Sequence, residues 1–111
     1  MIENVILNYL SDHLDVPVCM EVPKVMPSAF IVIEKTSASR TNYIDSSTLA
    51  IQSYGDSLLQ AAELSSQVKD AMYNSIQLNE VSRCELNSEY NYTDESIKKY
   101  RYQAVFDLTH Y

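Results

Sequence analysis

A chain of 111 residues with 46% hydrophobic and 21% charged side chains can build one ordered core but not two. Its single glycine excludes the glycine-rich loops that cradle nucleotide phosphates, and its net charge of −7 disfavours binding to a nucleic acid backbone. No apolar run approaches the ~20 residues of a membrane span, and no export signal is recognisable at the start, so we expect a protein that stays in the cytoplasm.

The first predicted element is an amphipathic helix from Ile2 to about Leu14. Its apolar side chains recur every three or four positions, while polar side chains occupy the opposite face. The following segment, residues 16–26, contains Pro17 and Pro23. Because proline cannot donate a backbone hydrogen bond, this segment predicts at most a short edge strand followed by an irregular connection.

A long β-hairpin is predicted next. Residues 28–36 form its first strand, and the apolar run at 30–33 is typical of a strand that is covered on both faces. The small polar residues 37–42 predict the hairpin loop, with Arg40 at its tip, and residues 44–54 predict the return strand.

A second helix is predicted after Gly55, which interrupts the strand. Asp56 or Ser57 can accept hydrogen bonds from the free N–H groups at its start, and it should end near Asn74. Helical spacing predicts one buried stripe on this helix, made of Leu58, Ala61, Leu64, Val68, Met72 and Ile76.

The remaining chain predicts a second antiparallel hairpin. Residues 81–92 and 100–108 alternate in polarity with the period of a β-strand, and residues 93–96 make the turn. On the first strand this alternation assigns one face to Cys84, Leu86, Ser88, Tyr90 and Tyr92. The complete order of elements predicts a single α+β domain over residues 1–111, with a mainly antiparallel sheet of about four to five strands and two helices packed on one face.

The residue types needed for catalysis do not gather into a recognisable pattern. His13, expected to be partly buried, and His110, expected at a strand end, do not stand at metal-ligand spacing from another His or Cys. Cys19 and Cys84 read as small hydrophobic residues that stay reduced. The hydroxyl groups of residues 46–48 have no neighbouring base in the sequence. We therefore predict a protein without enzymatic activity, cofactor or metal.

Tyrosine is the distinctive residue type. The chain has nine tyrosines, two phenylalanines and no tryptophan, and five of the tyrosines fall near the C-terminus: Tyr90, Tyr92, Tyr100, Tyr102 and Tyr111. Tyrosine favours interfaces because its ring packs while its hydroxyl keeps a hydrogen bond. Aromatic pairs between neighbouring strands would explain the same pattern. Both interpretations hold if the hairpin projects beyond the core.

Several stretches together resemble a known family of small tail-region proteins. They are Val22-Pro23 leading into residues 30–36, then residues 49–54, residues 61–64 and residues 100–109. This combination resembles the tail terminator proteins of long-tailed bacteriophages and prophages, also called tail completion or head-tail joining proteins. The resemblance covers nearly the whole chain.

The resemblance implies a self-assembling structural protein located in the neck of the virion tail. Members form a closed ring, typically hexameric, on the head-proximal end of the tail tube, where the ring stops tube polymerisation and meets the head connector. The implied partners are copies of the chain itself, the tail tube protein and the head connector. DNA would pass through the ring without specific binding, which suits an acidic lining.

We expect the subunit or partner contacts at two places, the hairpin loop at 37–42 and the end of the C-terminal hairpin. The candidate residues are Arg40, Tyr90, Tyr92, Asp94, Glu95 and Lys98. Another neck or tail-tube component is the alternative within the same class. A soluble acidic regulatory or inhibitor protein, which would be a monomer with a basic partner, is the alternative from a different class.

Overall fold

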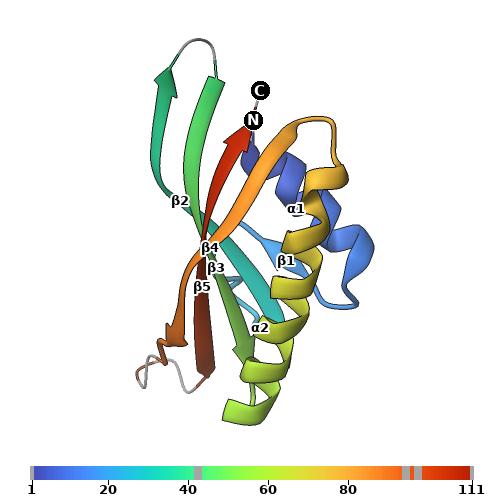
Figure 1. The fold of residues 1–111 in the computed structure, drawn as a ribbon. Helices are drawn as coiled ribbons and strands as arrows, with labels where there is room; N and C mark the ends of the chain where they lie inside the picture. The colour runs from blue at the N-terminus through green and yellow to red at the C-terminus, as the bar shows by residue number, and fades with distance from the viewer. Residues whose placement is uncertain (1, 42–43, 94–95, 97–98, 111) are drawn as a thin grey trace.

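The computed structural model describes residues 2–41, 44–93, 96 and 99–110, and it forms an α+β fold as predicted. Two helices lie on one face of a five-stranded sheet, and the other face carries no helix in the part of the chain described (Figure 1). The elements in chain order are α1 (Ile2–His13), β1 (Val18–Cys19), β2 (Phe30–Thr41), β3 (Ile44–Gly55), α2 (Leu58–Tyr73), the 3₁₀ helix η1 (Asn74–Gln77), β4 (Val81–Asn91) and β5 (Tyr100–His110).

The strand order is β1-β2-β3-β5-β4. β1 pairs parallel with β2, as the short edge strand that was expected after α1. The pairs β2–β3, β3–β5 and β4–β5 are antiparallel, so the two predicted hairpins lie side by side in the sheet. Consequently the two edges of the sheet are formed by β1 with the upper half of β2 on one side and by β4 on the other.

The main core lies between the helices and the sheet. Side chains at alternate strand positions point toward the helices, where they meet the apolar stripes of α1 and α2. The fully buried members include Ile6, Leu10, Ile31, Ile33, Leu49, Ile51, Val68, Met72, Ala104, Phe106 and Leu108. The apolar run at 30–33 is buried on both faces of the sheet, as predicted.

A smaller apolar cluster lies on the helix-free face. It consists of Phe30, Val32 and Tyr54, with Met26 packed against it. Met26 belongs to the segment that joins β1 to β2, residues 20–29, which we call the strap. The Nζ atom of Lys99 donates to the carbonyl oxygens of Pro27 at 3.0 Å and Ser28 at 3.3 Å, and it also contacts the carboxylate of Asp56. Lys99 therefore ties the end of the strap to the bottom of the sheet.

The prediction of a hairpin loop at residues 37–42 is wrong for most of that range. β2 continues to Thr41, and Ser37 to Arg40 pair in register with β3. A bulge between Lys35 and Ser37 accommodates an extra residue, after which the ladder resumes. Small polar residues have weak strand propensity, but the row of backbone hydrogen bonds to β3 decides the outcome.

Two side chains of the predicted stripe on α2 and one on α1 are more exposed than predicted. Leu58 in the first turn is exposed, and Ile76 is exposed because α2 ends at Tyr73 and the chain tightens into η1. His13 is also exposed; its Nδ1 atom lies 2.8 Å from the carbonyl oxygen of Tyr9. The start of α2 agrees with expectation, since the Ser57 side chain accepts a hydrogen bond from the backbone N–H of Gln60.

The predicted faces of β4 change partway along the strand. A bulge between Leu86 and Ser88 shifts the register against β5. Cys84 and Leu86 therefore pack against the helix-side core, whereas Tyr90 lies on the other face. A single inserted residue exchanges the two faces because side chains alternate with period two.

Candidate functional site

A chain of hydrogen bonds crosses three strands on the helix-free face of the sheet. Arg101 Nη1 donates to the Tyr54 hydroxyl at 2.9 Å, and that hydroxyl donates to Gln52 Oε1 at 3.2 Å. Gln52 Nε2 donates to Gln103 Oε1 at 2.9 Å, and Gln103 Nε2 donates to the Tyr90 hydroxyl at 2.6 Å. Both glutamines are buried. Buried amides need such partners, and this network supplies them while fixing the position of Tyr90.

Tyr92 is held by the same arginine. The guanidinium carbon of Arg101 lies 4.4 Å from the centre of the Tyr92 ring, and Arg101 Nε donates to the Tyr92 carbonyl oxygen at 2.7 Å. The rings of Tyr90 and Tyr92 meet edge to face, with their centres 5.7 Å apart. Their side chains nevertheless stay 42% and 47% exposed. The two tyrosines thus form an exposed aromatic surface with a fixed conformation, which we call the tyrosine edge.

β4 is also tied to α2 on the opposite face. Glu89 accepts hydrogen bonds from Ser65 Oγ at 2.6 Å and from Lys69 Nζ at 2.9 Å. Burial opposes ionisation of Glu89, but these two donors outweigh burial and hold the pKa of its carboxyl below the usual range. The hydrogen bond that Lys69 donates to Glu89 likewise raises the pKa of Lys69. The strand that bears the tyrosine edge is therefore anchored to the helix layer.

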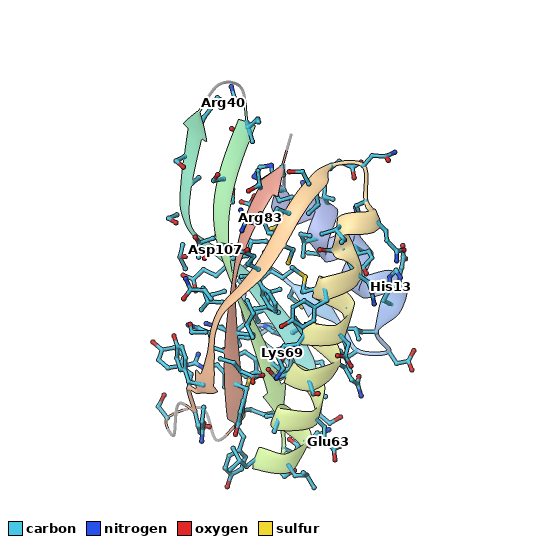
Figure 2. All side chains as sticks on the ribbon, viewed as in Figure 1. His13, Arg40, Glu63, Lys69, Arg83 and Asp107 are labelled. Atoms are coloured by element: carbon cyan, nitrogen blue, oxygen red, sulfur yellow. The ribbon has the colours of Figure 1, made fainter. Side chains whose placement is uncertain are left out.

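The upper half of the helix-free face is polar and mainly acidic. The register and the strand period place Glu34, Glu85, Asp107 and Arg83 there. Arg83 pairs with Glu85, and Asp107 accepts hydrogen bonds from two neighbouring polar side chains, Thr48 and Asn87. A shallow hollow of about 330 Å³ lies beside these residues. Figure 2 labels Arg83 and Asp107 on this part of the sheet.

Arg40 lies near the top of the β2–β3 hairpin (Figure 2). Its Nε and Nη2 atoms donate to the two carboxylate oxygens of Asp45 at 2.7 and 3.2 Å. The hydrogen bond to Arg40 lowers the pKa of the Asp45 carboxyl, and the same bond raises the pKa of Arg40. A partner that binds Arg40 must compete with Asp45.

A serine and a histidine meet on the helix side of the sheet, beneath this hairpin. Ser47 Oγ lies 2.8 Å from His110 Nε2, and both residues are buried. The expectation that the hydroxyls of residues 46–48 have no neighbouring base is therefore wrong, because the antiparallel pairing of β3 with β5 brings together residues far apart in the sequence. Both carboxylate oxygens of the nearby Asp45 accept hydrogen bonds from Arg40. The hydrogen bond between Ser47 and His110 links β3 to β5.

The six candidate contact residues do not form one site. Tyr90 and Tyr92 come together at the bottom of β4, and Arg40 lies at the other end of the molecule. Asp94, Glu95 and Lys98 fall outside the described residues. Sequence reasoning missed Arg101, Gln52 and Gln103, which hold the tyrosines, because only the pairing of β3, β5 and β4 shows that they are neighbours.

The two cysteines, Cys19 and Cys84, are both free. Burial raises the pKa of the Cys84 thiol, which favours its protonated form. Within the described ranges, no group of three or more His, Cys, Asp or Glu side chains is arranged to hold a metal ion. Among the described helices, none is long and apolar enough to cross a membrane.

Comparison with known proteins adds no relative. A scan against models of protein families finds none that matches this chain, and a search of curated proteins finds no match either.

Proposed function

We propose that this chain is a structural subunit of a phage tail, which forms a ring on the head-proximal end of the tail tube, stops tube growth and joins the tail to the head. The observation that supports this proposal best is the helix-free face of the sheet. Its upper half presents three carboxylates (Glu34, Glu85 and Asp107) against one guanidinium (Arg83) in a chain whose net charge is −7.

A ring with the helices outside would turn this face toward the lumen. An acidic lining repels the phosphates of a passing DNA, so the DNA moves through without being held. The network of hydrogen bonds below it keeps this face rigid without a covering helix. The same features suit another neck or tube component, so the test must separate a protein that caps tubes from one that lengthens them.

The test is a capping assay with the tail tube protein of the same phage or prophage. Tube protein is polymerised alone or with this chain, and tube lengths are measured by electron microscopy. A terminator shortens and blocks the tubes at substoichiometric amounts, whereas a tube component extends them. If the chain leaves tube length unchanged and remains monomeric, the proposal fails. That result would favour the alternative of an acidic regulatory or inhibitor protein.

A matched pair of charge reversals tests the orientation of the sheet. Glu34→Lys changes the helix-free face, and Glu63→Lys places the same charge on the exposed surface of α2 (Figure 2). We expect only the Glu34→Lys ring to retain duplex DNA in a gel-shift assay at low salt. Equal retention by the two variants would contradict an inward-facing sheet.

A further inference from the structure

Two apolar surfaces lie unpaired on opposite edges of the sheet. The strap, which directly follows the edge strand β1, exposes three aliphatic side chains: Met20 (40%), Val22 (43%) and Val25 (88%). On the β4 edge lies the tyrosine edge. Grouped apolar exposure on a small soluble domain marks an interaction surface rather than a random distribution. Three strands, β2, β3 and β5, lie between β1, which the strap follows, and β4, which bears the tyrosine edge.

The two surfaces lie at the same level along the strands. β1 ends at Cys19, immediately before the strap, and Cys19 pairs with Val32. From Val32 the register leads across the sheet through Gln52 and Gln103 to Tyr90. A copy placed beside the first without a shift along the strands would therefore bring its strap against the tyrosine edge.

The backbone directions agree with this placement. β1 covers β2 only up to Val32, and no described strand pairs with the rest of that edge or with the outer edge of β4. β2 and β4 run in opposite directions, as the three antiparallel pairings between them require. Rotation about an axis parallel to the strands preserves strand direction. It would therefore set β2 of one copy antiparallel to β4 of the next and keep all helices on one side.

Charge favours the same contact. Copies of a chain with a net charge of −7 repel one another, so association is easiest where the local charge is zero. The strap contains one acidic residue, Glu21, and one basic residue, Lys24. Beside the tyrosines, Glu89 is paired with Lys69, and Arg101 contributes the further positive charge. Among the residues that the structure describes, neither surface thus carries an acidic excess.

The surfaces are also held ready for contact. Lys99 and Met26 fix the end of the strap, and Arg101 and Gln103 fix the tyrosines. Little conformational entropy is then lost when the side chains are covered, which favours binding. A rigid aromatic pair against aliphatic side chains is a composition typical of interface centres.

We infer that a second copy of this chain docks head to tail, with the strap of one copy packed on the tyrosine edge of the next. In the proposed ring, this would be the contact between neighbouring subunits. The inference rests on the proposed function in that respect alone. The contact uses two different surfaces, so a pair of copies still has one free surface of each kind, and repeated addition closes a ring or continues as a filament.

The test mixes two variants that each lose one surface. Val25→Asp disrupts the strap and Tyr92→Asp disrupts the tyrosine edge; Tyr92→Ser replaces the latter should it fail to fold. Leu59→Asp and Tyr73→Asp, at α2 side chains that are 69% and 52% exposed, are the matched controls. Folding of every variant is checked by circular dichroism, and assembly is measured by sedimentation velocity.

The wild type and both controls should sediment as oligomers, and each interface variant alone as a monomer. Mixed one to one, the two interface variants should form a dimer, since the Val25→Asp chain keeps its tyrosine edge and the Tyr92→Asp chain keeps its strap. A mixture that stays monomeric overturns the inference, as does a wild type that is monomeric at high micromolar concentration. Tube capping by such a wild type would leave the proposed function standing with a different contact.

Discussion

Replacing Gln103 with leucine should destabilise the fold more than replacing Gln52 and Gln103 together. Leucine at 103 leaves the buried Nε2 of Gln52 without its acceptor, which lies 2.9 Å away in the native protein. An unsatisfied buried polar group costs about 1–3 kcal/mol, so we expect the free energy of unfolding to fall by about 2 kcal/mol. Gln52→Leu should cost a similar amount, because Gln103 Oε1 then loses its donor.

The double variant removes both amides at once, and the Tyr54 hydroxyl still accepts a hydrogen bond from Arg101 but loses Gln52 Oε1 as its acceptor. Replacing both amides by apolar groups is nearly neutral, and the lost Tyr54 hydrogen bond contributes about 1 kcal/mol, so we expect a loss of about 1 kcal/mol and a coupling of about 3 kcal/mol between the two sites. Equilibrium urea unfolding, followed by circular dichroism at low protein concentration, measures all four free energies. Additive losses in the double variant would refute the reasoning that the amides are buried and mutually dependent. Gln103→Leu should also weaken self-association, since Tyr90 loses the bond that positions it.

Two further predictions concern the anchors of β4 and of the strap. The pKa of Glu89 is lowered in the folded state, so its contribution to stability is present above its unfolded pKa, which is near 4.5, and is lost as the pH falls through the folded value. Urea titrations should therefore show that the stability difference between the wild type and Glu89→Gln shrinks on acidification below about pH 4.5; a difference that is constant or grows would contradict the assignment. Lys99→Met should free the end of the strap and speed tryptic cleavage after Lys24, which mass spectrometry can follow. Cleavage at the wild-type rate would show that Lys99 does not hold the strap.

Periodicity was sufficient for most of the fold. The stripes on α1 and α2 and the alternation in β5 predicted which faces are buried, because each reflects one continuous element with one apolar side. The hairpin made by β2 and β3 was also predicted, but the extent of its strands was not. Ser37 to Arg40 lack strand propensity and become strand only because β3 offers a row of hydrogen-bond partners.

The candidate assembly surface was predicted only in part. Tyr90 and Tyr92 stood out by residue type, whereas the strap was read as an irregular connection without a role. Neither the exposure of Val25 nor the placement of β1 and β4 at opposite edges follows from local pattern, because both depend on the tertiary structure. The bulge in β4 that turns Tyr90 away from the helices leaves no clear signal in the sequence either.

Composition and local pattern by themselves determined the acidic character, the α+β fold class, two amphipathic helices and two β-hairpins, since these follow from charge and the spacing of apolar residues. The tertiary structure alone decided the strand order, the faces of β4, the network that joins Arg101 to Tyr90, and the placement of the strap and the tyrosine edge on opposite sides of the sheet. Those features come from pairing between residues distant in the chain, which no local period encodes.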